Sequence, residues 1–182
     1  MRLKEFVSAN PYMEGAGWRQ ELVGGEEVVL PARPENLQQR SLSVFGALVG
    51  CARRADGKQR IDSGSGIGIE TPDGDHFRIA DVIIQLPGKM ARRFDPVLVA
   101  LVVSDVDALA AEDAARLDVY RRHKTVKEVL LFSADRAVCG VHRRFGGAWS
   151  DERVSGGDAT VRLGSLGVSL LLLTAYPDLA PD

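Results

Sequence analysis

Cysteine and histidine are both scarce in this chain of 182 residues, which has two cysteines and three histidines. Cys51 and Cys139 are far apart and belong to no CxxC pair or Cys/His cluster, so we expect no structural zinc site. His76, His123 and His142 fall on separate predicted elements without H-x-x-x-H spacing, which argues against a histidine metal site. The cysteines are therefore predicted to be buried free thiols.

Long apolar runs are also absent. The longest, over residues 168–175, is interrupted by Ser169 and Thr174 and is well short of the roughly 20 residues that cross a bilayer. The first 15 residues contain no apolar segment typical of a secretory signal. We therefore expect a cytoplasmic protein with no membrane partner.

No excess of either charge is present, because the formal net charge is only −2. This balance excludes a protein whose whole surface is basic and attracts nucleic acid. Two local basic clusters, residues 121–124 and 143–144, are interpreted either as solvated faces or as phosphate contacts.

The composition and length fit one globular domain, since 45% of the residues are hydrophobic. Residues 1–19 mix glycine, proline and polar residues, so we expect an irregular N-terminal arm there and a single domain over residues 20–182.

The hydrophobic pattern predicts an α/β fold, a mixed β-sheet with flanking helices. Apolar residues recur at helical spacing over residues 35–54, and residues 108–123 are predicted to form a second helix capped by Ser104 or Asp105. The continuously apolar residues 96–103 favour a central strand buried on both faces. Further strands are predicted at 21–23, 28–30, 65–70, 77–86, 126–132, 137–144, 148–154, 159–163 and 168–173.

Familiar catalytic motifs are missing. Residues 64–68, Gly-Ser-Gly-Ile-Gly, lack the Gly-Lys-Ser/Thr ending of a P-loop and do not open onto a helix. A glycine-rich strand or bulge is the alternative interpretation of that segment. No Gly-x-Ser-x-Gly elbow occurs anywhere in the chain.

One charged residue interrupts an apolar strand. Asp81 lies in the string Arg78-Ile-Ala-Asp81-Val-Ile-Ile84, where a carboxylate needs an amide, a cation or a metal as its partner. A second apolar strand and then a helix with acids and an arginine follow it. This is the order of parts in metal-dependent nucleases, in which two acids hold Mg²⁺ and the metal activates water.

These segments resemble the Uma-two family, which is grouped with restriction endonucleases in the PD-(D/E)XK nuclease superfamily. The resemblance extends from about Gln20 to Leu179. It rests on the family's "YELIDGELV" hairpin, the helix after it, and the "xPDVVV", "PDLVVEVLS", "KLxxY" and "GVxEYWLVD" motifs. These are similar to residues 21–29, 31–50, 79–83, 96–104, 116–120 and 126–131.

The same resemblance shows where this chain departs from the family pattern. Leu101 stands at the position of the metal-binding Glu, Arg116 at that of the helix Lys, and Glu112 at that of an Asp one turn earlier. Among these core residues only Asp81 matches the pattern, and Ala80 replaces the proline before it.

The resemblance therefore implies Asp81, Arg116 and Glu112 as candidate catalytic residues, with Asp81 as the metal ligand and Mg²⁺ as the cofactor of an active enzyme. An Asp81–Arg116 ion pair is an alternative to the metal, and Glu112 or Asp105 could supply a missing acid.

Three hypotheses stay open: a nuclease-fold protein with a degenerate site that acts by binding, an active Mg²⁺-dependent DNA endonuclease, and an unrelated α/β domain that binds a small molecule or a protein. DNA is the candidate partner of the first two. A homodimer is also expected, because residues 168–173 are apolar at nearly every position.

Overall fold

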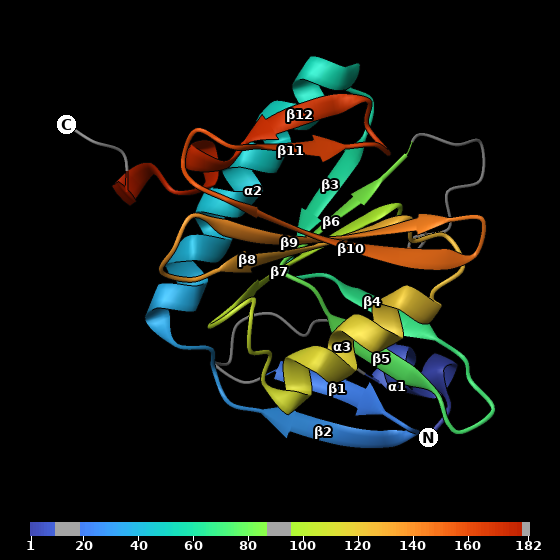
Figure 1. Cartoon of the computed structure of the whole chain (residues 1–182). Helices are drawn as coiled ribbons and strands as arrows, with labels where there is room; N and C mark the ends of the chain where they lie inside the picture. The colour runs from blue at the N-terminus through green and yellow to red at the C-terminus, as the bar shows by residue number, and fades with distance from the viewer. Residues whose placement is uncertain (10–18, 87–95, 180–182) are drawn as a thin grey trace.

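The computed structural model describes residues 1–9, 19–86 and 96–179 (Figure 1). Its helices are α1 (Leu3–Ala9), α2 (Glu35–Ala55) and α3 (Ala111–Arg122), with 3₁₀ turns at Leu172–Ala175 and Pro177–Leu179. The strands are β1 (Arg19–Val23), β2 (Glu26–Leu30), β3 (Arg60–Ser63), β4 (Gly66–Ile69), β5 (His76–Ile79), β6 (Val82–Gln85), β7 (Leu98–Val103), β8 (Glu128–Ser133), β9 (Val138–Phe145), β10 (Ala148–Ser155), β11 (Thr160–Leu163) and β12 (Val168–Leu171).

The larger sheet is six-stranded and mixed, with the order β10-β9-β8-β7-β6-β3. Its only parallel pair within the described chain is β7 and β8, which the α3 crossover connects. Every residue of β7 and β8 is buried, as the apolar runs predicted for central strands. The expected α/β fold with a mixed sheet and flanking helices is confirmed.

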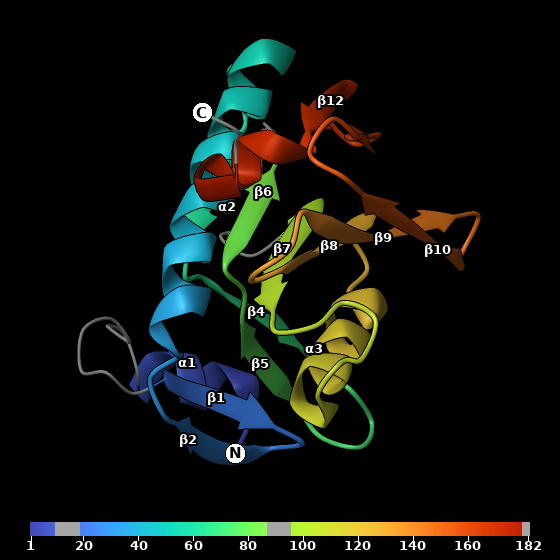
Figure 2. The same cartoon turned by 60° about the vertical axis from the view of Figure 1, so that its left-hand side comes forward.

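Helices cover both faces of this sheet (Figure 2). On one face, Val44 and Leu48 of α2 pack with Leu130 of β8. On the other, Leu117 of α3 packs with Leu131 of the same strand. Because neighbouring strand residues point to opposite faces, β8 contributes to both apolar layers and holds the two helices in fixed positions.

A second, four-stranded antiparallel sheet has the order β2-β1-β5-β4. It shares a long hairpin with the larger sheet, because β3 pairs with β6 and β4 pairs with β5. The hairpin changes sheets at Gly64, which has a φ of +61°, and at Asp81, whose carbonyl accepts the Gly64 N–H at 3.0 Å. The single strand predicted over residues 77–86 is thus two strands. The glycine-rich segment 64–68 is a bend followed by β4 and not a bulge, because the pairing keeps one register from Ser63 with Val82 to Gly66 with Ile79.

The N-terminal segment is partly helical. The expectation of an irregular arm is wrong over Leu3–Ala9, which forms α1. The Leu3 N–H donates to Asp75 Oδ2 at 2.8 Å, and the buried Phe6 ring lies 5.4 Å from the Phe77 ring. Both contacts come from distant residues. Residues 10–18 lie outside the described chain, and the division into an arm and a domain stays a prediction.

Helix α3 begins later than predicted. Its N-cap is Ala110, without a side-chain hydrogen bond, so the predicted cap by Ser104 or Asp105 is wrong. Asp105 instead accepts the Asp107 N–H at 2.9 Å and binds Arg136 at 2.7 Å. It therefore stabilises the turn before the helix.

The apolar C-terminal run folds back onto its own chain. Strand β12 pairs with β11, and Leu170 and Leu172 are buried in the α2 layer, whereas Leu171 is 41% exposed. The homodimer is expected because this run is apolar at nearly every position. Most of its apolar surface is covered within one chain, and the oligomeric state stays a prediction.

Two remaining expectations concern thiols and membranes. Cys51 and Cys139 are free and buried, as predicted. The pKa of each thiol is raised, chiefly by burial, so both thiols stay protonated. Among the described helices, none is long and apolar enough to span a membrane.

Gly66 gives a direct test of how the hairpin packs. A Cβ at this position would lie 1.9 Å from Cζ of the Phe77 ring, so Gly66→Ala is expected to lower the free energy of unfolding by about 1–3 kcal/mol. Gly46→Ala on α2 is the control: nothing lies within 4 Å of its Cβ, and the helix should gain about 0.5–1 kcal/mol. Urea unfolding measures both; equal effects of the two variants would contradict this packing.

Candidate functional site

Asp81 lies where the hairpin enters the larger sheet, directly before β6. Strands β6 and β7 are antiparallel neighbours, with Val82 opposite Ala100, and the Val102 N–H donates to Asp81 Oδ2 at 2.7 Å. The predicted adjacency of the Asp81 and Leu101 strands is confirmed. Leu101 is 2% exposed and packs in the same apolar layer as α3.

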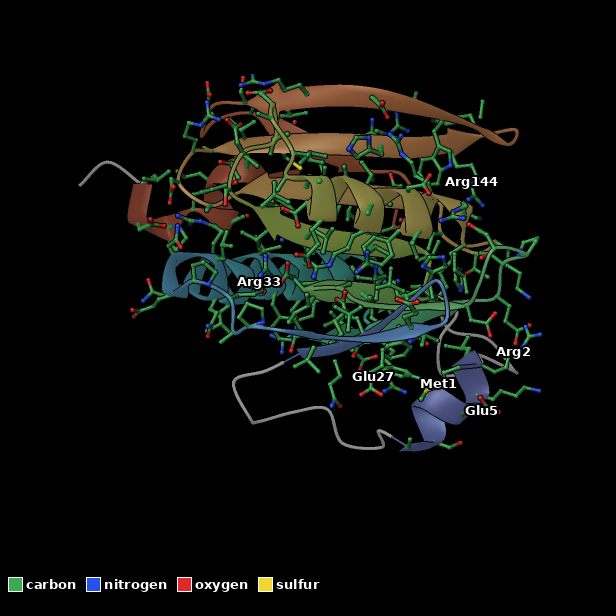
Figure 3. All side chains as sticks on the ribbon, turned by 90° about the horizontal axis from the view of Figure 1, so that it is seen from below. Met1, Arg2, Glu5, Glu27, Arg33 and Arg144 are labelled. Atoms are coloured by element: carbon green, nitrogen blue, oxygen red, sulfur yellow. The ribbon has the colours of Figure 1, made fainter. Side chains whose placement is uncertain are left out.

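The carboxylate of Asp81 is fully engaged by its own chain. Its Oδ1 accepts hydrogen bonds from Ser41 Oγ at 3.0 Å and from Arg33 Nη1. Arg33 also donates through Nη2 to the Val102 carbonyl, so one guanidinium bridges β7 and the strand crossing. Arg33 belongs to the segment between β2 and α2, and Figure 3 shows it beside α2.

A second ionic cluster surrounds Glu21 on β1. Its carboxylate is completely buried and accepts hydrogen bonds from Arg78 Nη1 at 2.6 Å and from the Ile79 N–H at 3.0 Å. The Nη2 atom of Arg116 lies 3.3 Å from Glu21 Oε1. Arg116 is itself 3% exposed, so α3 is joined to the smaller sheet by a buried ion pair.

Arg116 therefore has different partners from the predicted one. It also contacts Glu112 one turn earlier and lies 3.4 Å from Asp113 Oδ1 through Nη1. The Asp81–Arg116 ion pair, given above as an alternative to the metal, is not formed: Asp81 pairs with Arg33, and Glu21 with Arg116. The charges of Asp81 and Arg33 also act on Asp113, which contacts Arg116.

Burial and charge shift the pKa values in this region. Burial raises the pKa of Asp113, against the opposing effect of Arg116 and Arg33. Burial by itself would lower the pKa of Arg116, but Glu21 and the other nearby acids raise it, so the guanidinium stays charged. Burial also raises the pKa of Tyr120, which keeps its phenol neutral.

Three buried polar atoms in the second cluster have no hydrogen-bond partner in the described chain: Nε of Arg78, Nε of Arg116 and the hydroxyl of Tyr120. Buried donors of this kind are ordinarily satisfied by bound water or a ligand. The cluster is thus rich in hydrogen-bond donors, whereas a metal ion binds to atoms with free lone pairs.

The side chains around Asp81 do not fit a divalent cation. Mg²⁺ takes an octahedral set of oxygen ligands, but both Asp81 oxygens already accept hydrogen bonds and Leu101 offers no oxygen. Glu112 is bound to Arg116, and Asp105 to Arg136. Across the described ranges, no group of three or more His, Cys, Asp or Glu residues could hold a metal.

Glu21, Arg33 and Arg78 were not predicted as site residues. The argument used for Asp81, that a charge inside an apolar strand needs a partner, applies equally to Arg78 between Phe77 and Ile79 and could have found it. Arg33 stands between Ala32 and Pro34 in a segment without periodicity, and no sequence signal pointed to it.

The two basic clusters are largely used within the chain. The Arg144 and Arg121 guanidinium carbons lie 4.8 and 5.7 Å from the centre of the Trp149 ring. Arg143 lies 3.3 Å from Glu128. Lys124 stays exposed. Few of these basic side chains are therefore left for phosphate contacts, and the choice between a solvated face and phosphate contacts stays open.

Comparison with known proteins identifies the fold. No protein-family model and no curated protein matches the sequence. The structure is similar to the crystal structure of a putative nuclease belonging to DUF820 from Anabaena variabilis ATCC 29413, with a TM-score of 0.73 and 14% identity over 99% of both chains. The chain thus has a nuclease-like fold.

The Glu21 cluster predicts an asymmetric response to substitution. Glu21→Gln leaves two buried guanidinium groups without their carboxylate, and should lower the free energy of unfolding by about 3 kcal/mol or more. Glu112→Gln is the control, because this partner of Arg116 is 44% exposed and its loss should cost less than about 1 kcal/mol. Equal losses in thermal or urea unfolding would show that Glu21 is not the principal partner.

Proposed function

We propose that this chain is a divergent relative of the Uma-two nucleases, with a degenerate site, that binds DNA without cleaving it. The observation that carries the proposal is the bridge made by Arg33 between Asp81 and the Val102 carbonyl. A guanidinium occupies the oxygen atoms that a divalent cation would need, and Leu101 removes the second carboxylate. Phosphodiester hydrolysis of this class requires a metal held by several fixed oxygens.

DNA is the proposed ligand because the likeness to a nuclease extends over nearly the whole chain. The low net charge does not oppose this, since contacts with phosphates need only a few well-placed cations. Binding of this kind should persist without a divalent metal and weaken as salt rises.

An active Mg²⁺-dependent endonuclease with an unusual site is the alternative. It would need a second acid beside Asp81, and Asp113 is the carboxylate on which the Asp81 charge acts. Asp113 is, however, within 3.4 Å of Arg116. This alternative therefore requires the arginines to move before a metal could bind.

The experiment that tests the proposal combines cleavage and binding. Wild-type protein should leave supercoiled plasmid intact in Mg²⁺ or Mn²⁺, and should bind labelled duplex DNA in EDTA with an affinity that falls steeply between 50 and 200 mM salt, roughly as counterion release dictates. Robust cutting that Asp81→Ala abolishes would establish the active alternative. The absence of saturable, salt-dependent binding would overturn the DNA-binding role.

Restoring ligands tests the site itself. Leu101→Glu combined with Arg116→Lys should allow Mn²⁺ to raise the melting temperature, because a second carboxylate then stands beside Asp81. Adding Arg33→Ala should strengthen the effect by freeing Asp81. Leu101→Gln with Arg116→Lys is the matched control, with a similar shape but no carboxylate. Burying an acid is costly without a metal, so each variant is compared with and without Mn²⁺. Identical Mn²⁺ responses of the Glu and Gln variants would contradict a metal-site ancestry.

A further inference from the structure

A pocket of about 770 Å³ lies near the edge of the smaller sheet that is opposite β2. It is lined by residues of α1, β4 and β5 and by residues at and just after the C-terminal end of α3. This volume lies within the range of roughly 300–1,000 Å³ typical of small-molecule sites. None of the Asp81 or Glu21 cluster residues lines it. The pocket is therefore a separate feature from the candidate nuclease site.

Part of the pocket lining is apolar. It consists of Leu3 and Val7 of α1, Ile69 of β4 and Phe77 of β5. Gly68 allows α1 to approach, since a Cβ there would lie 2.7 Å from Leu3 Cδ2. The shape is held by anchored elements, because Asp75 caps α1 and Phe6 packs on Phe77.

The pocket lining also carries positive charge. Lys4, Arg122 and Lys124 line it, with Glu70 as the acid among the lining residues. Arg122 is already 3.0 Å from Asp118. Lys4 and Lys124 are exposed and are paired with no carboxylate in the described part of the chain. Two ammonium groups, one on α1 and one in the segment after α3, are thus available to a ligand.

We propose that this pocket binds a small amphipathic anion, with its apolar body against Leu3, Val7, Ile69 and Phe77 and its carboxylate, sulfonate or phosphate at Lys4 and Lys124. Apolar burial supplies most of the affinity. The two lysines select a charged head group, because opposite charges attract strongly where part of the solvent is excluded. This inference is independent of the proposed loss of cleavage and of DNA binding.

The test uses two dyes that share the same rings. 8-Anilinonaphthalene-1-sulfonate carries an anionic head, whereas N-phenyl-1-naphthylamine is uncharged. Fluorescence titration should show one saturable site for each dye, with the sulfonate bound about tenfold more tightly at low salt. Lys4→Glu with Lys124→Glu should weaken the sulfonate about tenfold or more and change the uncharged dye less than about twofold.

Two further variants locate the site. Lys58→Glu reverses an exposed lysine next to the C-terminal end of α2 and should leave both affinities unchanged. Val7→Trp places a larger side chain in the apolar part of the lining and should weaken the binding of both dyes. No saturable binding, equal sulfonate affinity in the Lys4/Lys124 variant, or no effect of Val7→Trp would overturn the proposal. Sedimentation showing that the dye dissociates a dimer would overturn it too, since a second copy would then be the natural occupant.

Discussion

A buried carboxylate has to be compensated, and the way in which Asp81 is compensated organises much of this molecule. Asp81 is 8% exposed at the point where a long hairpin passes from one sheet to the other. Its three partners come from β7, from α2 and from the segment that precedes α2. Satisfying one side chain thus holds together the strand crossing, the start of a helix and the centre of the larger sheet.

Several features of the fold followed from the sequence because their causes are local. The apolar run of β7, the helical spacing of α2 and the turn with Gly146 and Gly147 between β9 and β10 each depend on neighbouring residues. Features with distant causes were missed or misplaced. Helix α1 is capped by Asp75, and the division of β5 from β6 accompanies a bend at Gly64, whose N–H donates to the Asp81 carbonyl across the hairpin.

The candidate site divides in the same way. The need of Asp81 for a partner could be predicted from the apolar residues around it, as could its place beside Leu101. The identity of the partner could not, because two arginines competed for two acids, and the choice depends on tertiary positions. Arg116 points to Glu21 of the smaller sheet, which leaves Asp81 to Arg33. A family pattern that aligns Arg116 with a lysine suggests nothing about this exchange.

The exchange has a chemical consequence. A guanidinium and a divalent cation both neutralise a carboxylate, but only the cation lowers the pKa of a bound water and polarises a phosphate. Arg33 is part of the chain itself, whereas a metal ion must bind from solution. Folding of this region therefore need not depend on the metal concentration. Substitution of a cation by an arginine would therefore preserve the architecture of a nuclease while removing its chemistry. Under the proposed function, the buried ion pairs keep this architecture in place, and binding would fall to surfaces where cations are unpaired. The described chain offers such cations at Lys4 and Lys124, beside an apolar cavity.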